Sequence, residues 1–446
     1  MNSTTFLKNL FLKGLEVCSP SRAVQKFLRV DGNEINVKDR SYTIEERPIY
    51  LFAVGKAAVS MYEQASKILA GYIIKSLVIT NDQEAAKACN ADRVIVGSHP
   101  QPEGQSFEAG NKAVDFMKGV PPGAIVITLI SGGTSSLLSL PAEGILIDDL
   151  SELYKMLNNS GATIHDINTV RKHCSKIKGG QLLRCLNPEV TLIDLVISDV
   201  PGDKLSIVGS GPTIPDWSTY QDAYHVLLEY DLWKQTPASV RTHIKKGIRG
   251  EVAETVTPKE ALIEKHQSEI ISSAPKLVEK IKDLALQKGV QVECADKPFN
   301  ENVEEVAGAI ADKVISTAKK DKSESNQPVL FIFWGESTVE VTGGGKGGRN
   351  QELALRGALK IAGYENITWL CGGTDGVDGP TDAAGAIVNG KTVVKARENN
   401  INLESYLFEN DSYHFHEQMD TLLKTGPTGN NLMDIVMVLI NDKKTG

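Results

Sequence analysis

Residues 124–136 read Ala-Ile-Val-Ile-Thr-Leu-Ile-Ser-Gly-Gly-Thr-Ser-Ser, a strongly apolar run that stops at a glycine turn. The apolar part, 124–130, predicts a buried β-strand, and the glycines predict the loop that ends it. The N-terminal half of the chain repeats this pattern, with helical spacing of apolar residues between several of the runs. Strands that alternate with helices, and that are apolar throughout, are typical of a parallel sheet covered on both faces. The other strands predicted here are 48–54, 75–80, 93–96 and 191–198.

A second α/β pattern occupies the C-terminal part of the chain. It follows a charged stretch, 235–265, in which hydrophobic periodicity is weak. We therefore predict two α/β domains, an N-terminal Rossmann-like parallel-sheet domain over residues 1–255 and a C-terminal α/β domain over residues 256–446. In the second domain we predict helices at 268–287 and 302–319 and strands at 290–294, 328–334, 337–341, 367–371, 386–388 and 435–440.

The composition excludes several classes of partner. The chain has 446 residues, with 48 Lys and Arg against 56 Asp and Glu, so its net charge is −8 and no basic block stands out. A nucleic-acid or anionic-membrane partner is therefore not expected. The longest apolar runs are far shorter than the ~20 residues of a membrane span. The six cysteines form no Cys-x-x-Cys pair, which is typical of a reducing compartment and indicates the cytoplasm.

The first residues of the chain carry apolar side chains at helical spacing, from Phe6 to Leu15. Lys8 and Lys13 interrupt the apolar stretch that a signal peptide needs. We therefore expect this segment to be a helix of the fold, while a mitochondrial location stays open as an alternative.

Two turns at the ends of predicted strands are suited to anions, because ligands of a parallel sheet bind beyond the carboxyl ends of its strands. Lys56 follows the 48–54 strand and opens a helix, where the helix dipole disfavours a cation unless an anion is also bound. The turn Ser131-Gly132-Gly133-Thr134-Ser135 offers backbone N–H groups and hydroxyls as an anion cradle. The alternative for Lys56 is a solvated lysine at the end of a loop. The alternative for the 131–135 turn is a glycine turn with a hydroxyl that caps the next helix.

Carboxylates follow three of the predicted strands. Asp199 and Asp203 come after the last strand of the N-terminal pattern and are suited to bind Mg²⁺, to act as a general base, or to form Asx turns. Glu336 lies just beyond a strand of the C-terminal pattern. Asp375 and Asp378 lie in a glycine-rich loop that is suited to a substrate or Mg²⁺, and that otherwise is an acidic surface loop.

Residues 343–349, Gly-Gly-Gly-Lys-Gly-Gly-Arg, place five glycines and two cations within seven residues. Such a loop can fold over a polyphosphate, with Gly345, Gly347 and Gly348 near the phosphates and Arg349 binding bidentately. The alternative is a flexible hairpin tip. Together the turns predict a polyphosphate, Mg²⁺ and a small anion, which are the components of phosphoryl transfer.

Taken together, these turns resemble those of the class II glycerate kinases, which pair an N-terminal glycerate kinase domain with a C-terminal MOFRL domain. The resemblance implies ATP as donor, Mg²⁺ as metal and D-glycerate as acceptor, phosphorylated at O2 in most members to give 2-phosphoglycerate. It also implies an active site in the cleft between the two domains. The matching motifs cover nearly the whole chain, at 54–58, 98–100, 129–136, 168–173, 176–180, 197–203, 209–216, 343–353, 372–385 and 425–429.

The resemblance also implies roles for single residues. The family's proposed catalytic lysine and arginine map onto Lys56 and Arg349, and we assign Asp203 as the base, with Asp199 second. Lys178 and Arg171 lie in a matched motif and would bind phosphate or carboxylate, unless they form an exposed basic helix face. For substrate and phosphate we expect Ser131, Gly132, Gly133, Thr134, Ser135, Lys178, Gly345, Gly347 and Gly348. For Mg²⁺ we expect Asp199, Asp375, Asp378 and Glu336.

Two departures and two alternatives accompany this interpretation. Lys346 is inserted among the glycines of the 343–349 loop, where it would add a phosphate contact or simply be solvated. Trp334 stands where the family has a small residue, which puts the backbone approach at that turn in question. A hydroxypyruvate or tartronate-type reductase using NAD(P)H is the nearest alternative, but no Gly-x-Gly-x-x-Gly follows the first strand. A protein that senses a small anion without catalysis is the other. Phosphorylation at O3 and the oligomeric state, monomer or homodimer, stay open.

Overall fold

The computed structural model describes residues 2–260, 262, 265–319 and 327–441. The chain divides into two compact units: residues 23–271, called here the parallel unit, and residues 272–446 with 1–22, called the mixed unit. This division differs from the boundary predicted at 255/256, because the strand β9 (Lys265–Ser272) extends the sheet of the parallel unit. The predicted position of the active site in an interdomain cleft stays a prediction.

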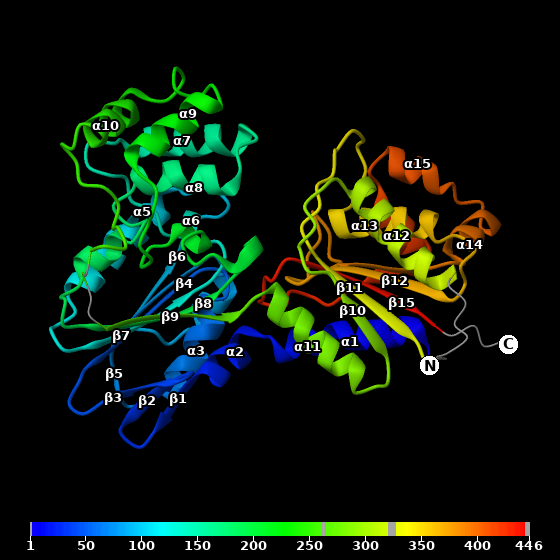
Figure 1. The fold of residues 1–446 in the computed structure, drawn as a ribbon, viewed down its shortest axis with the longest axis horizontal. Coiled ribbons are helices and arrows are strands. Elements are labelled where there is room, and N and C mark those ends of the chain that lie inside the picture. Colours follow the sequence, from blue (N-terminus) through cyan, green and yellow to red (C-terminus); the bar gives the residue numbers. More distant parts are fainter. Residues whose placement is uncertain (1, 261, 263–264, 320–326, 442–446) are drawn as a thin grey trace. The chain divides into compact units, whose positions relative to one another are not determined.

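The sheet of the parallel unit has the strand order β6-β5-β4-β7-β8-β9 (Figure 1). Neighbours from β6 to β8 pair in parallel, and β4 and β7 are buried along their whole length, as their apolar sequences predict. The helix predicted from 268 is wrong at its start, because β9 runs to Ser272 and the helix begins at Ala274. The five predicted strands are confirmed as β4 Ile49–Val54, β5 Ile73–Thr80, β6 Arg93–Val96, β7 Ile125–Ile130 and β8 Thr191–Ile197.

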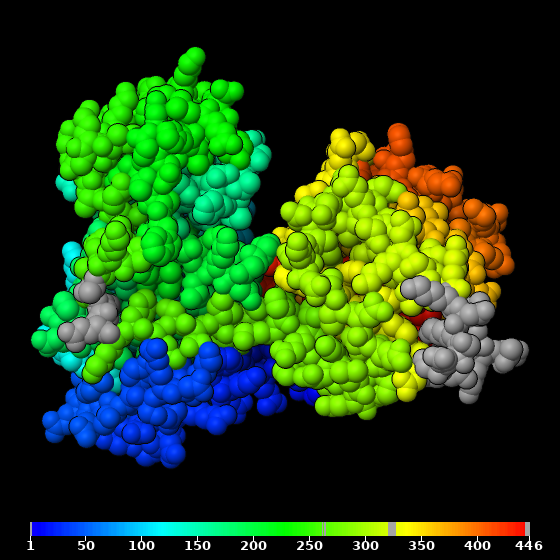
Figure 2. Space-filling model, viewed as in Figure 1, coloured from blue at the N-terminus to red at the C-terminus, as the bar shows by residue number. Residues whose placement is uncertain are grey.

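Helices cover both faces of this sheet (Figure 1). The helix α5 (Gly104–Lys118) packs Phe116 against Tyr50 and Phe52, and α3 (Ala58–Ile68) contacts β4, β5 and β7. A small antiparallel sheet and the helices α9 (Tyr220–Glu229) and α10 (Ala238–Ile248) lie at opposite ends of the unit, as the labels of Figure 1 and the blue and green regions of Figure 2 show. The smaller elements are α2 Pro20–Phe27, β1 Leu28–Asp31, β2 Glu34–Val37, β3 Arg40–Thr43, α4 Gln83–Ala88, α6 Thr134–Leu137, η1 Gln181–Cys185, η2 Pro201–Asp203 and η3 Val208–Ser210.

Four further helices form a layer with a core of its own. They are α7 Ile147–Asn159, α8 Ile164–His173, α9 Tyr220–Glu229 and α10 Ala238–Ile248. The helix α10 lies inside the charged stretch that we interpreted as a boundary, and it buries Val240 and Ile244 against the other helices of this layer. Its charged residues lie on the opposite, solvated face, which explains why the apolar signal was weak.

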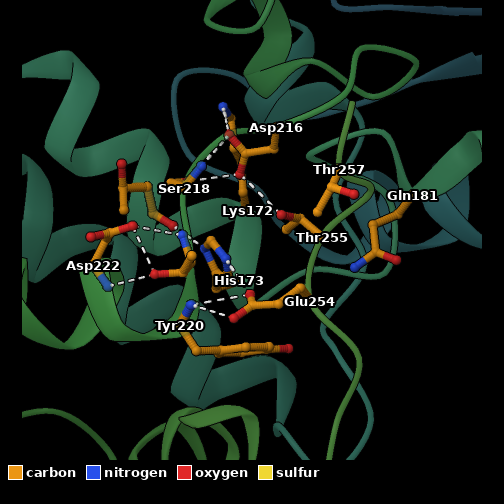
Figure 3. Close-up of polar contacts among 12 residues, drawn as sticks. Lys172, His173, Gln181, Asp216, Ser218, Tyr220, Asp222, Glu254, Thr255 and Thr257 are labelled. Atoms are coloured by element: carbon orange, nitrogen blue, oxygen red, sulfur yellow. Dashed lines mark hydrogen bonds and ion pairs between the residues drawn. The ribbon is translucent and has the colours of Figure 1, made fainter. Parts of the chain in front are cut away.

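A buried polar cluster ties this helical layer to the loops that follow the sheet (Figure 3). Lys172 on α8 forms an ion pair of 2.9 Å with Asp216, which also accepts hydrogen bonds from Ser218 (2.7 Å) and Thr255 (3.2 Å). Burial alone would raise the pKa of Asp216, but Lys172 and the hydrogen bonds lower it. Nearby, His173 lies between Thr169 O (2.8 Å) and Glu254 Oε2 (3.1 Å).

The mixed unit has a six-stranded sheet of order β10-β11-β15-β12-β13-β14 (Figure 1). Among the described strands of this sheet, β10 and β11 pair in parallel and the other neighbours pair antiparallel. The strand predicted at 337–341 is wrong, because this segment makes a single bridge, between Thr338 and Asn302, and then continues as a loop. The strands are β10 Gln291–Cys294, β11 Val329–Gly335, β12 Ile367–Gly373, β13 Gly385–Asn389, β14 Leu422–Leu423 and β15 Asp434–Ile440.

The N-terminal helix α1 (Ser3–Val17) belongs to the mixed unit. It contacts α11 (Ala274–Leu286), β12 and β15, and it buries the apolar residues that predicted it, from Phe6 to Leu15. A side chain at Gly372 would meet the ring of Phe11, so the helix lies directly on β12. The other helices are α12 Val303–Lys319, α13 Arg349–Lys360, α14 Thr392–Glu398, α15 Leu403–Phe408 and α16 Ser412–Gln418.

Among the residues that the structure describes, no helix combines the length and the apolar content needed to cross a lipid bilayer.

Candidate functional site

Three predicted site loops meet at the carboxyl end of the parallel sheet. Lys56 follows β4, Ser131 follows β7, and Asp199 lies just beyond β8, and these strands are direct neighbours. The Lys56 N–H donates to Gly132 O at 2.8 Å, and the Ala57 N–H donates to Ser131 Oγ at 3.1 Å. The loops after β4 and β7 are thus joined by hydrogen bonds, as the topology of a parallel sheet predicts.

Glycine is needed at two positions of this turn. A side chain at Gly132 would collide with the carboxylate of Asp199, so the carboxylate lies directly against the turn. Gly133 has a φ of 83°, and a Cβ there would lie 3.1 Å from Cγ of Lys56 and 3.2 Å from Cδ2 of His99. The two glycines therefore allow Lys56 and Asp199 to approach the same turn from neighbouring strands.

The hydroxyls of the turn make contacts within the protein. Buried Thr134 donates to Ser131 O at 2.7 Å, and Ser131 Oγ accepts from the loop after β4. The Ser135 hydroxyl lies 2.7 Å from that of Ser210, which donates to Asn168 on α8 at 2.6 Å. These bonds shape the turn. The prediction that Ser131, Thr134 and Ser135 bind an anion stays a prediction.

Lys178 is buried behind the same turn. Its ammonium donates to Ser135 O at 2.6 Å and to Leu138 O at 3.0 Å, and burial together with nearby Arg171 lowers its pKa to about 7. The alternative of an exposed basic helix face does not hold for Lys178. Its contacts are those of a residue that fixes the turn from within, and the prediction that Lys178 binds phosphate stays a prediction.

Asp203 lies in the short helix η2, four positions beyond Asp199, and is half-buried with a φ of 52°. This left-handed conformation is uncommon for a residue other than glycine, and Asp is among the residues that tolerate it. The structure thus places the predicted base in the loop that follows β8, on the same side of the sheet as Lys56.

In the mixed unit, Arg349 is the first residue of α13 and is held by two carboxylates. Its Nε lies 2.6 Å from Asp434 Oδ2 and its Nη2 lies 3.2 Å from Asp434 Oδ1. The same Nη2 lies 2.9 Å from Glu336 Oε1. Burial alone would lower the pKa of Arg349, but the two carboxylates raise it. Burial raises the pKa of Asp434 to about 7 against the opposing charge of Arg349.

Asp434 was not among the site residues predicted from the sequence. It begins β15 and pairs with Gly335 of β11 and Gly373 of β12. Because β15 is antiparallel to both strands, its first residue lies at the edge where they end. The only sequence signal was an acid at the head of the apolar run 435–440, and its meaning depends on the antiparallel pairing.

The glycine loop is anchored rather than free, which corrects the alternative of a flexible hairpin tip. The segment 409–411 accepts hydrogen bonds from the backbone of the glycine loop. The Gly345 N–H donates to Glu409 O at 2.8 Å, and the Lys346 N–H donates to Asp411 Oδ1 at 2.9 Å. Side chains at Gly345 and Gly347 would also collide with this segment and with Ser412. The Gly345 amide is therefore engaged within the protein, and only an exchange of partners would let it bind phosphate.

The predicted metal ligands have separate environments. Asp378 is buried and accepts from the N–H groups of Asn350 (3.1 Å) and Gln351 (2.8 Å), so it caps the start of α13. Burial raises its pKa despite these bonds. Asp375 is half-buried and accepts from Val377 N–H at 3.1 Å. Within the described part of the chain, no three His, Cys, Asp or Glu residues are grouped so as to hold a metal ion.

Arg349 lines a cavity of about 620 Å³ in the mixed unit. Trp334, which we expected to disturb this region, is buried in β11, where its indole N–H donates to Ala295 O at 3.2 Å. Among the described residues it is not part of the cavity lining. The bulky side chain therefore fills space beside β10 rather than the neighbourhood of Arg349.

Comparison with known proteins identifies the relatives of this chain. Residues 6–245 match a domain of unknown function, DUF4147, and residues 329–434 match the MOFRL family. The glycerate 2-kinase of Pyrococcus horikoshii is 38% identical over 97% of this chain and 96% of its own length. The chain belongs to the class II glycerate kinase family. The D-glycerate 2-kinase of Thermotoga maritima is 36% identical and covers 96% of each chain.

A solved structure agrees with this membership. The crystal structure of the glycerate kinase from Thermotoga maritima has a TM-score of 0.84, with 33% identity over 98% of this chain and 99% of that one. This member of the class II glycerate kinase family thus carries Lys56, Asp199 and Asp203 in its parallel unit and Arg349 with Asp434 in its mixed unit.

Proposed function

We propose that this chain is an ATP-dependent glycerate kinase that transfers the γ-phosphoryl group to O2 of D-glycerate and forms 2-phosphoglycerate. The observation that carries the proposal is near full-length similarity to relatives named glycerate 2-kinase. The residues agree with it, because Lys56 and Arg349 supply the cations that phosphoryl transfer needs. The same comparisons favour a kinase over the reductase considered above.

Residues of the parallel unit would bind glycerate, the phosphoryl acceptor, and activate its hydroxyl group. Lys56 is half-buried beside Gly133 and would bind the carboxylate of glycerate or the transferred phosphoryl group. Asp203, or Asp199 in second place, would accept the proton of the attacking hydroxyl. The glycerate oxygen then forms the new bond to phosphorus while the bond between the γ-phosphorus and the bridging oxygen of ADP breaks.

Arg349 would stabilise the charge that spreads over the transferred group. Its Nε and Nη2 are held by Asp434 and Glu336, so its position is set before the donor binds. The carboxylate of Asp375 fits Mg²⁺, which takes one or two carboxylates together with phosphate oxygens, and Mg²⁺ would neutralise phosphate charge when bound. We propose that this enzyme works in the cytoplasm.

A coupled assay tests the proposal. D-glycerate, ATP and magnesium chloride are mixed with enolase and pyruvate kinase, first without and then with phosphoglycerate mutase. Formation of pyruvate without the mutase means phosphorylation at O2. Formation of pyruvate only with the mutase means phosphorylation at O3. No signal in either assay would overturn the proposed activity.

A further inference from the structure

The cavity beside Arg349 is larger than a three-carbon acid requires. Its volume of about 620 Å³ lies in the range of sites that enclose drug-sized molecules, roughly 300–1,000 Å³. The lining comes entirely from the mixed unit, from the segments around 337–352, 375–380, 410 and 431–434. The size therefore favours a ligand that is several times larger than glycerate.

The mouth of the cavity is apolar. Val341 is 74% exposed and Val377 is 43% exposed, although both line the cavity. Exposed valines that face one concave site lose water contact when a flat apolar group lies against them. Pro380 extends this apolar border. The mouth thus fits the faces of a heterocyclic base.

The interior of the cavity holds polar atoms that lack partners. Asn350 and Ser337 are 2% and 4% exposed, and both line the cavity. Asn350 Oδ1 and Ser337 Oγ have no hydrogen-bond partner among the described residues. Buried polar atoms are rarely left unpaired, so each calls for an explanation. Asn350 Oδ1 is an acceptor, so its matching partner on a ligand is an N–H or O–H donor.

The charges of the lining indicate where an anion would lie. Glu352 is paired with Arg356 at 2.8 Å, Asp378 caps α13, and Asp434 holds Arg349. These three acids are committed to partners within the protein. Among the described residues that line the cavity, Arg349 is the one with a permanent positive charge, so the anionic groups of a ligand would lie on its side.

We infer that this cavity binds the nucleoside part of a nucleotide, with the base between Val341 and Val377. Donor groups of the base or ribose bind Asn350 Oδ1 and Ser337 Oγ, and the phosphates extend toward Arg349. The inference rests on the proposed function in one respect, which is that a kinase binds a nucleotide as its phosphoryl donor. The mixed unit then carries the donor site, and the loops after β4, β7 and β8 carry the site for the acid.

Binding of ADP to the full chain, with magnesium chloride present, tests this assignment by calorimetry. The double variant Val341→Ala/Val377→Ala should weaken ADP binding about tenfold, because it removes apolar contact with the base. Ser337→Ala should weaken it several-fold without lowering the unfolding temperature, because it removes a buried hydroxyl that has no partner among the described residues. Val394→Ala is the matched control, since Val394 is 50% exposed on α14 of the same unit.

The outcomes separate this inference from the proposed function. Weaker ADP binding in the Val341/Val377 and Ser337 variants, with the Val394 control at the wild-type value, supports the nucleoside site even if glycerate is not phosphorylated. Wild-type ADP affinity in both variants overturns the site, even if the enzyme phosphorylates glycerate normally. Loss of ADP affinity in the Val394 control as well would also overturn it, because the effect would then not belong to the cavity.

Discussion

Asp434 accepts two hydrogen bonds from Arg349, with Oδ2 2.6 Å from Nε and Oδ1 3.2 Å from Nη2. Two parallel bonds fix the plane of a guanidinium more firmly than a single bond does. Asp434 is buried in β15, the strand that lies between β11 and β12, so its own position is set by the sheet. Glu336, whose side chain is 46% exposed, adds a third and weaker contact.

Asp434→Asn should therefore lower kcat for glycerate phosphorylation by about 10- to 100-fold, because Arg349 loses its fixed orientation at the transferred group. Glu365→Gln is the control and should leave kcat nearly unchanged, because Glu365 pairs with Lys391 at the surface of the same unit and an exposed ion pair contributes little, about 0–1 kcal/mol. Steady-state kinetics of both variants measure this. Equal losses in the two variants would contradict the positioning role of Asp434.

Lys178 should make stability depend on pH in the alkaline range. Burial lowers its pKa in the folded protein to about 7, whereas the unfolded chain keeps the ordinary value near 10.4. Between these values the unfolded state binds more protons, so the free energy of unfolding rises as pH rises from 7 to 10. The slope from this one group is at most about 1.4 kcal/mol per pH unit.

Lys178→Met should remove this part of the slope, and urea unfolding of both proteins at several pH values measures it. The neutral lysine still donates to Ser135 O and Leu138 O, so its bonds persist at high pH. The difference in stability between the two proteins should therefore change in favour of wild type as pH rises. A constant difference between pH 7 and 10 would show that Lys178 titrates as an ordinary lysine.

The buried pair Lys172–Asp216 should be costly to break (Figure 3). Lys172→Met leaves Asp216 as an unpaired buried carboxylate, which costs about 3–5 kcal/mol of unfolding free energy. The exposed pair Lys280–Asp283 is the control, and Lys280→Met should cost no more than about 1 kcal/mol. Chemical denaturation measures both. Similar losses would mean that burial of the Lys172 pair has no energetic consequence.

Trp334 should matter for stability and not for catalysis. Trp334→Phe removes the hydrogen bond to Ala295 O and should lower the free energy of unfolding by about 1–2 kcal/mol. The KM for ATP should stay at the wild-type value, because the side chain lies outside the cavity lining. A severalfold change of that KM would place Trp334 near the nucleotide after all.

Local patterns predicted much of the parallel unit. The apolar runs of β4, β7 and β8 are continuous, and the loops that follow parallel neighbours must share one edge of the sheet. For this reason Lys56, Ser131 and Asp199 could be grouped from sequence. The role of Lys178 could not, because its burial depends on how α8 and the 208–211 segment pack behind the turn.

The mixed unit was harder to predict because its site depends on contacts between distant segments. Asp434 reaches Arg349 only because β15 runs antiparallel between β11 and β12. The segment 409–411, which holds the glycine loop, has no signal of its own in the sequence. The packing of α1 onto β12 likewise joins residues that are more than 350 positions apart.

The rate of 2-phosphoglycerate formation by Lys56→Met, compared with wild type at saturating ATP and D-glycerate, tests the account most directly. Among the described residues, the Lys56 side chain has no hydrogen-bond or ion-pair partner, so this variant should keep its unfolding temperature. We predict that wild type forms 2-phosphoglycerate without added mutase and that the variant is at least about 10³-fold slower, as expected for a cation at a transferred phosphoryl group. A folded Lys56→Met enzyme with a rate within tenfold of wild type would contradict the account.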